Sequence, residues 1–183
     1  MNLTNHFLIA MPALADPNFN RTVTYVCAHN EEGAMGIVIN RPLDLSLGEV
    51  LGHMDMDATN PTARNMRVLQ GGPVQRERGF VIHLPAGEWD AVLEVGDHIG
   101  VATSRDILAA IARGEGPERA VVALGYAGWG AGQLEREVAE NAWLSGPADT
   151  SIIFDAPYEG RWEAAAQLVG VDFGRLSADA GHA

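Results

Sequence analysis

The residues best suited to chemistry are a histidine and the arginines that precede it. Four arginines lie within fifteen residues, and Glu77 is the only acidic residue among them. The arginines are Arg64, Arg67, Arg76 and Arg78. His83 follows in "GFVIHLP", and strand alternation puts it at a strand end just after the loop "GGPVQRERG". An imidazole near guanidinium groups can bind an anion or transfer a proton. Two plainer interpretations stay open, a hydrogen-bonded structural histidine and a solvated rim of arginines.

A second candidate is the stretch "LGYAGWGAGQLEREVAENAWL", residues 124–144, which packs glycines around Trp129 ahead of a helical pattern. Free amides at a turn between a strand and a helix can hold phosphate. Glu135 and Glu137, which we place in the first helical turn, would already occupy that end of the helix dipole and repel an anion. We therefore expect the glycines to allow close backbone packing, with Trp129 on a packed recognition surface.

Signatures of the common catalytic classes are missing. All twelve basic residues are arginine, which excludes a P-loop lysine and a Schiff base. We find neither a G-x-S-x-G elbow nor H-E-x-x-H spacing. The nearest metal-like pattern is "HMDMD", with His53, Asp55 and Asp57, but it lies on a polar stretch where a solvated acidic loop is the favoured interpretation. We predict no metal and no cofactor.

Composition and charge restrict the partners. The chain has 183 residues, 47% of them hydrophobic, and a net charge of −12. A chain this acidic repels nucleic acid over most of its surface, and no apolar run approaches the roughly 18 residues that span a membrane. Cys27 is the only cysteine, shares a strand face with Val23 and Tyr25, and is expected to be a buried thiol in a reducing cytoplasm.

The pattern of elements predicts an α+β fold in a single domain, residues 1–183. Strand patterns form hairpins early and alternate with helices later, and we count about eight strands and four helices. The helices are expected at 46–54, with a capping box of Ser46 and Glu49, at 103–114, with Thr103 as the cap, at 132–144 and at 160–170. The stretch "TSIIFD", residues 150–155, is expected to be a strand. The sheet is predicted to be mixed and strongly bent or barrel-like, with the helices flanking it.

Seven motifs in order carry a family resemblance. They are "FLIAMP", "EGAMGIVINRP", "QGGPV", "RGFVIH", the glycine–tryptophan stretch at 124–144, "FD" followed by "RW", and the terminal "GHA". Together they resemble the AlgH/YqgE family of small bacterial proteins over nearly the whole chain. The resemblance implies a compact α+β fold with a barrel-like mixed sheet. One member is named as a proposed transcriptional regulator of alginate synthesis, but the family has no established activity, DNA-binding motif or catalytic residues.

Residues of these motifs form our candidate binding surface. Most are polar or glycine, types that a structural core does not usually demand. The surface consists of Asn40, Arg41, Gly71, Gly72, Arg76, His83, Gly128, Trp129, Gln133, Glu135 and Asn141.

Two hypotheses for the function stand. The favoured one is a non-enzymatic cytoplasmic regulatory protein that acts through a protein partner or a small ligand, with direct nucleic-acid binding disfavoured. The alternative is an enzyme acting on a small anionic or nucleotide-like substrate. There Arg41, Arg76 and Arg78 would bind the anion, His83 would carry a proton and Glu135 would be a base, so these side chains must converge on one cleft.

Overall fold

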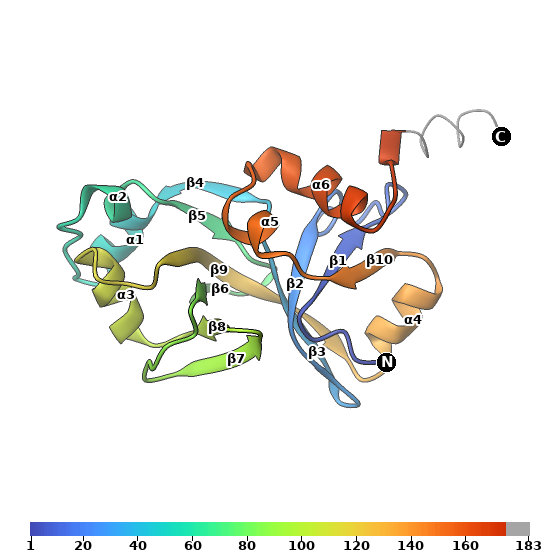
Figure 1. The fold of residues 1–183 in the computed structure, drawn as a ribbon, viewed down its shortest axis with the longest axis horizontal. Coiled ribbons are helices and arrows are strands. Elements are labelled where there is room, and N and C mark those ends of the chain that lie inside the picture. The colour runs from blue at the N-terminus through green and yellow to red at the C-terminus, as the bar shows by residue number, and fades with distance from the viewer. Residues whose placement is uncertain (175–183) are drawn as a thin grey trace. The chain divides into compact units, whose positions relative to one another are not determined.

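The computed structural model describes residues 1–174, so the "GHA" motif at 181–183 lies outside the described residues. The chain forms two compact units, unit 1 (residues 1–40 and 127–174 of the described chain) and unit 2 (41–126). The fold is α+β with a mixed, strongly bent sheet, as predicted (Figure 1). One strand, β9 (Arg119–Gly130), contributes its first part to unit 2 and its last part to unit 1.

Unit 1 is built on an antiparallel sheet with the strand order β10-β1-β2-β3-β9. Its own strands are β1 (His6–Ala10), β2 (Val23–Asn30), β3 (Gly33–Val38) and β10 (Trp143–Pro147). The helices are α4 (Gln133–Ala139), α5 (Thr150–Phe154) and α6 (Arg161–Leu168), with a short 3₁₀ turn η1 (Tyr158–Gly160). A bulge between Val26 and Ala28 breaks the β2–β3 register and bends the sheet there.

Both faces of the unit 1 sheet are buried. Leu8 and Ala10 belong to a cluster with Trp129, while the alternate residues Phe7 and Ile9 are also fully buried. On α6, the indole nitrogen of Trp162 donates to the carbonyl of Ala10 at 2.9 Å, which ties the helix to β1. Strands of a sheet that is covered on both faces have continuous apolar sequences. The first strand, "HFLIA", therefore lacks the alternation of apolar and polar residues.

One prediction for a unit 1 side chain is confirmed. Cys27 is buried, and burial raises the pKa of its thiol to about 12, so the thiol stays protonated. The structure also buries both residues of the "RW" motif, Arg161 and Trp162. Buried Arg161 donates from Nη1 to the carbonyl of Ile39 at 2.7 Å and from Nε to that of Ala156 at 2.9 Å.

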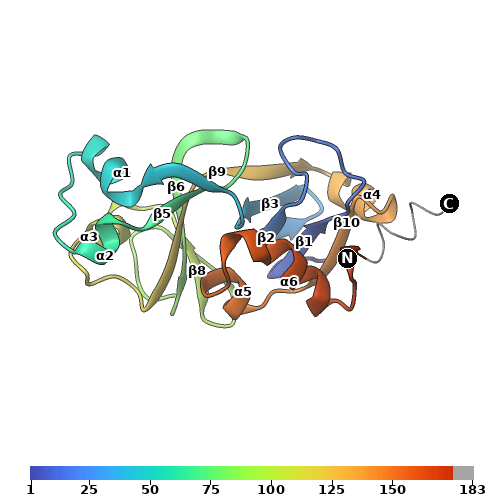
Figure 2. The same cartoon turned by 90° about the horizontal axis from the view of Figure 1, so that it is seen from above.

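Unit 2 has the strand order β4-β5-β9-β6-β8-β7, in which β5 and β9 are parallel and the other pairs antiparallel. The strands are β4 (Pro42–Ser46), β5 (Arg67–Gln70), β6 (Val74–Leu84), β7 (Val92–Gly96) and β8 (Ile99–Ala102). Three helices, α1 (Leu47–His53), α2 (Pro61–Arg64) and α3 (Arg105–Ala112), lie near one another within this unit (Figure 2). They share one core with strands β5, β6, β8 and β9.

Local signals explain the helix starts of unit 2. Ser46 and Glu49 form the predicted capping box on α1. Asn60 caps α2, because its side chain accepts from the backbone N–H of Ala63 at 3.0 Å. At α3 the cap is Ser104 rather than Thr103, and the Ser104 hydroxyl bonds Asp106.

Three expectations about the elements are corrected. The stretch expected to be a strand at 150–155 forms helix α5 up to Phe154, because Asp149 caps this segment by accepting from the backbone N–H of Ser151 at 2.8 Å. The helix expected at 132–144 ends at Ala139, and Trp143 begins β10. Residues 1–174 therefore contain ten strands and six α-helices rather than eight and four. The single-domain assignment stays a prediction. None of the helices within residues 1–174 has the length and apolar character needed to cross a bilayer.

Candidate ligand-binding cleft

A cleft of about 390 Å³ opens within unit 2 between α1, α3, β6 and β9. This volume lies in the range of sites for small molecules, roughly 300–1,000 Å³. The lining combines a mainly apolar wall with a few charged groups. It consists of Leu45, Val50, His53, Met54, Glu77, Arg78, Gly79, Thr103, Arg105, Leu108, Val122 and Leu124.

The spacing of apolar residues along α1 and β9 determines which side chains form the apolar wall of the cleft. Val50 lies on α1 and Met54, four residues later, is the residue that ends the helix, so the two side chains face the same side. Val122 and Leu124 alternate on β9 and point to the same side of the sheet. Gly79 completes the wall from β6, and a Cβ added there would meet no atom within 4 Å, so the absence of a side chain leaves the cleft open.

Two arginines bring positive charge to this cleft. Arg105 donates from Nη2 to the carbonyl of Met54 at 2.6 Å, which ties α3 to the end of α1. Arg78 donates from Nη1 to Oε1 of Gln75 at 3.3 Å, and its guanidinium lies 5.5 Å from the ring centroid of Phe80. Both are exposed, as is Glu77, the one carboxylate of the lining. An apolar wall with guanidinium groups suits a ligand with an apolar body and an anionic head.

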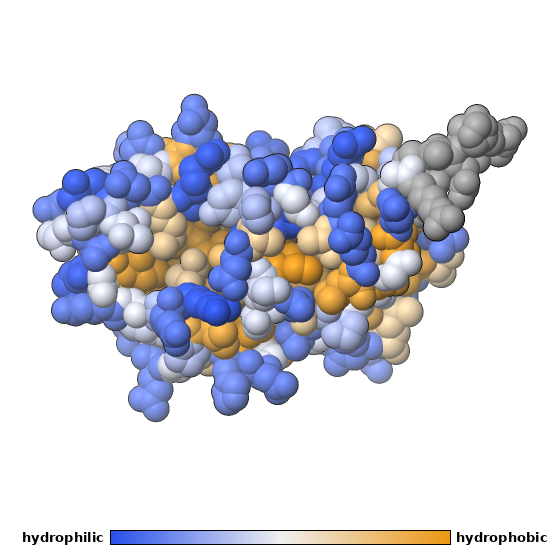
Figure 3. Space-filling model, turned by 45° about the horizontal axis from the view of Figure 1, so that its top comes forward, coloured by the Kyte–Doolittle hydropathy of each residue, from blue (hydrophilic) through white to orange (hydrophobic). Residues whose placement is uncertain are grey.

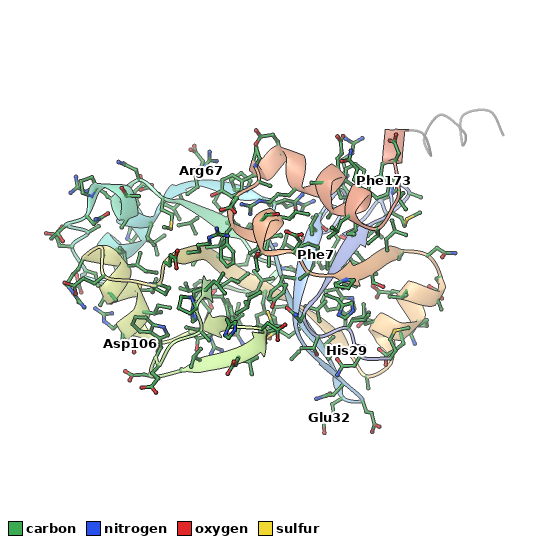
Figure 4. All side chains as sticks on the ribbon, viewed as in Figure 1. Phe7, His29, Glu32, Arg67, Asp106 and Phe173 are labelled. Carbon is green, nitrogen blue, oxygen red and sulfur yellow. The ribbon has the colours of Figure 1, made fainter. Side chains whose placement is uncertain are left out.

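The rest of the predicted arginine cluster does not face the cleft. Arg64 donates from Nε and Nη2 to the carbonyl of Ala58, and Arg67 does the same to the carbonyl of Leu43 (Figure 4 labels Arg67). Arg76 is exposed on the irregular first half of β6, where the register with β9 shifts between Val74 and Gly79. Of these four arginines, Arg78 alone lines the cleft.

His83 is a buried structural residue rather than a member of the cleft lining. Its exposed fraction is 0%, and its Nδ1 donates to the carbonyl of Pro85 at 2.9 Å. Burial lowers the pKa of the imidazole, so the ring is neutral and Nε2 carries a lone pair. That nitrogen has no hydrogen-bond partner in the described structure. A Cβ on Gly100 would clash with this ring, so Gly100 allows the close packing.

Glu135 is engaged with a histidine in unit 1. Buried His29 accepts from the backbone N–H of Leu3 at its Nδ1, at 2.9 Å, so its Nε2 carries the proton and donates to Oε1 of Glu135, also at 2.9 Å (Figure 4 labels His29). This hydrogen bond lowers the pKa of the Glu135 carboxyl. Both residues line an open acidic recess together with Glu31 and Glu32. Glu135 therefore has a structural partner of its own.

We expected Trp129 to lie on a packed recognition surface, but the structure buries it. Its exposed fraction is 6%, and its ring packs against Phe19 and Trp143. The indole nitrogens of Trp129 and Trp143 both donate to Oε1 of Glu137, at 3.1 and 3.0 Å. Glu137 is thus in the second turn of α4, turned toward the tryptophans, and not in the first turn as we expected. Buried indoles need such an acceptor, and the helix supplies it.

Gln133 and the glycines complete this arrangement. The Gln133 side chain accepts from the N–H of Gly130 at 3.0 Å and donates to Oε2 of Glu137 at 2.8 Å. Gly132, at φ +73°, is the left-handed cap from which α4 starts, a conformation that favours glycine. The glycine-rich stretch accordingly shapes the backbone around buried tryptophans.

The remaining residues of the candidate surface are distributed over both units. Asn40 accepts from the N–H of Val23 and donates to the carbonyl of Arg21, both at 2.9 Å. Half-buried Arg41 accepts at its carbonyl from the N–H of Gln70 at 2.8 Å. Gly71 and Gly72 are buried in unit 2, where a Cβ on Gly125 would lie 2.5 Å from the Gly72 oxygen. In unit 1, Gly128 pairs with Met35, and exposed Asn141 has φ +61°.

None of the eleven predicted surface residues lines the cleft of unit 2. The cleft residues that sequence reasoning missed are Gly79, Thr103, Arg105 and the apolar wall. One weak sequence signal pointed to Arg105, because this residue lies in the first turn of a strongly amphipathic helix. It has the same charge as Arg78, but nothing in the sequence indicates that the two residues meet. Among residues 1–174 no group of three or more His, Cys, Asp or Glu side chains is arranged to hold a metal, so the "HMDMD" pattern does not form a ligand set there.

Comparison with known proteins decides the family. A family model described as AlgH-like matches residues 7–174. The chain belongs to the AlgH-like family. Its relatives include UPF0301 proteins of Nitrosococcus oceani, 59% identical over 98% of this chain and 96% of the relative, and of Thioalkalivibrio sulfidiphilus, 59% identical over 100% and 97%.

Solved structures agree with this family assignment. The solution structure of AlgH from Pseudomonas aeruginosa is 53% identical, with a TM-score of 0.82 over 100% of this chain and 97% of that one. A crystal structure of a Corynebacterium diphtheriae protein, 18% identical, matches with a TM-score of 0.71 over 91% and 86%. At that identity the second likeness concerns the fold alone.

Proposed function

We propose that this AlgH-like protein is a non-enzymatic regulatory protein of the cytoplasm that binds a small amphipathic anion in the cleft of unit 2. The observation that carries the proposal is the pairing of an apolar wall with two arginines in one cleft of ligand size. Burial of a ligand's apolar body would supply most of the affinity, at about 25 cal/mol per Å². The guanidinium groups would select a carboxylate or phosphate head.

Several contacts support binding over catalysis. The residues assigned to the enzyme hypothesis have other partners, since His83 is buried against Pro85 and Glu135 is bonded to His29 in unit 1. General acid–base work needs a titratable group within hydrogen-bond reach of the substrate. In this cleft the candidates are His53 and Glu77, and no hydrogen bond joins these two in the described structure. A regulatory role comes from the family resemblance and would act through the ligand.

A matched ligand series tests the proposal. Octanoate and octyl phosphate supply the anion, while octanol and octylamine keep the chain and change the head, all below their critical micelle concentrations. We expect both anions to bind, measured by calorimetry and by NMR shifts of residues in the lining. Octanol is expected to bind about tenfold more weakly, the loss of one charge-assisted hydrogen bond. Equal binding of octylamine would refute the charge selection.

Two variants locate the site. Gly79→Ile places a side chain into the cleft at a position where a Cβ meets nothing within 4 Å, and isoleucine suits a strand. We expect it to fold normally and to lose octanoate binding. Arg78→Gln should weaken the anions but not octanol, whereas Arg113→Gln, an exposed arginine outside the cleft, should change neither. Undiminished octanoate binding by Gly79→Ile would overturn the assignment of the site.

A further inference from the structure

Strand β7 is an open edge of the unit 2 sheet. It pairs with β8 on one side and stands last in the strand order, so within residues 1–174 no strand covers its other side (Figure 1, in yellow-green). An edge strand presents unpaired N–H and C=O groups that can accept another strand. No residue of β7 lines the cleft described above, so this edge is a separate feature.

The register shows which main-chain groups face outward. The carbonyl of Ala91 accepts from the N–H of Thr103 at 3.0 Å, and the N–H of Ala91 donates to Oγ of Ser104 at 3.0 Å, so Ala91 points toward β8. Backbone groups alternate in direction along a strand. Leu93 therefore also points inward, and the N–H and C=O groups of Val92 and Glu94 face the open side.

The side chains of β7 are unusually apolar for an exposed edge. Val92 is 36% exposed and Leu93 47%, two of the four large hydrophobic residues that are exposed among residues 1–174. Natural edge strands are commonly protected by charged side chains, proline or a β-bulge. The sequence "VLEVG" has no lysine or proline, and its one charged residue, Glu94, directly precedes the point where the register with β8 shifts, so the pairing of residues 92–94 is regular. Hydrophobic surface also lies open between hydrophilic side chains on the face drawn in Figure 3.

Charge distinguishes the occupants that such an edge could take. Four carboxylates, those of Glu88, Asp90, Glu94 and Asp97, lie in or beside β7, and residues 86–98 contain no arginine or lysine. Antiparallel pairing of two copies would bring these groups together, and like charges on facing strands are destabilising. A strand with basic side chains would instead be attracted.

We propose that β7 binds an extended, arginine- or lysine-containing segment of a partner protein by β-strand addition. The bound segment would pair with the outward groups of Val92 and Glu94. Its alternate side chains would contact Leu93 on one face of the sheet and the Glu94 carboxylate on the other. This gives the protein a second, macromolecular site besides the cleft for a small anion.

An NMR titration with a defined peptide tests the proposal. The probe is an end-blocked heptapeptide of alternating arginine and valine, added to ¹⁵N-labelled full-length protein. We expect the amide signals of residues 91–96 to shift first, and the amides of Val92 and Glu94 to gain protection from hydrogen exchange. The same peptide with its central valine N-methylated lacks one edge donor and should bind about three- to tenfold more weakly. Shifts spread over all acidic surfaces, with no protection at β7, would overturn the proposal.

Variants of the edge separate pairing from simple charge attraction. Val92→Pro removes an outward donor at the first position of an edge strand, where proline is tolerated, and should weaken the peptide about three- to tenfold. Glu94→Gln should weaken it and reduce its salt dependence. Unchanged affinity in both variants would contradict strand addition. Light scattering of the free protein tests the alternative that β7 pairs with a second copy of the chain. A dimer that dissociates in the Val92→Pro variant would establish that alternative and contradict binding of a partner segment.

Discussion

Removal of the Glu137 carboxylate should destabilise unit 1 because two buried indoles depend on it. Trp129 and Trp143 are 6% and 3% exposed, and both donate to the same oxygen, Oε1 of Glu137. A buried donor left unsatisfied costs about 1–3 kcal/mol. For Glu137→Ala we expect the free energy of unfolding to fall by about 2–4 kcal/mol, since water can reach part of the site from the half-buried Glu137. Glu140→Ala, an exposed position of the same segment, should cost less than about 0.5 kcal/mol.

A charge swap sharpens this prediction. In Glu137→Gln the new amide group would face the Nε2 donor of Gln133, which is held in place because its own oxygen accepts from Gly130. We expect a loss of about 1–2 kcal/mol. Adding Gln133→Glu to this variant restores an acceptor opposite the new amide. The double variant has the same net charge as the original protein and has an acidic residue in the first turn of α4. Most of the lost free energy of unfolding should therefore be recovered.

Urea unfolding followed by circular dichroism measures these differences, and the indole N–H signals in NMR report on the contacts. The signals of Trp129 and Trp143 should move in Glu137→Ala, while that of Trp162, which donates to Ala10, should stay. The reasoning is refuted if Glu137→Ala is no less stable than Glu140→Ala, or if the swapped double variant is no better than Glu137→Gln alone. The first result would mean that the indoles find other acceptors at no cost.

Two further predictions concern unit 2. Gly52→Ala should raise the free energy of unfolding by about 0.5–1 kcal/mol, because a Cβ there meets nothing within 4 Å on a helix. Gly48→Ala, on the same helix, should lower it by about 1 kcal/mol or more, because its Cβ would lie 2.7 Å from Cγ and 3.0 Å from the carbonyl oxygen of Arg64. Urea titrations of both variants test this contrast, which fails if their effects have the same sign. For His83, burial lowers the folded pKa below the ordinary value of about 6.5, so the unfolded chain binds the proton more readily. Stability should therefore fall as the pH drops from about 6.5 toward the lowered pKa, and His83→Asn should flatten that slope; an unchanged slope would contradict the assignment.

Local signals in the sequence were enough for much of the fold. The capping box of Ser46 and Glu49, the hairpin of 23–38 and the amphipathic helix after Ser104 depend on contacts between residues close in sequence, so short-range patterns reveal them. The family was also evident from ordered motifs and is confirmed. Residues 150–155 were misassigned because β-branched isoleucines favour a strand, while the Asp149 cap and packing into the core produced a helix.

The candidate site was harder to predict, because its residues meet only through tertiary contacts. Arg78 and Arg105 are far apart in the chain, and α3 and β6 bring them to one cleft. The polar and glycine residues of the family motifs suggested a surface, but Trp129 and His83 are buried and bonded, since a polar group can serve packing as well as binding. The sequence by itself thus determined the family, the fold class and the start of α1 at its capping box, which depends on local interactions. Only the tertiary structure decided which side chains face a common cavity, because that depends on the pairing of strands distant in sequence.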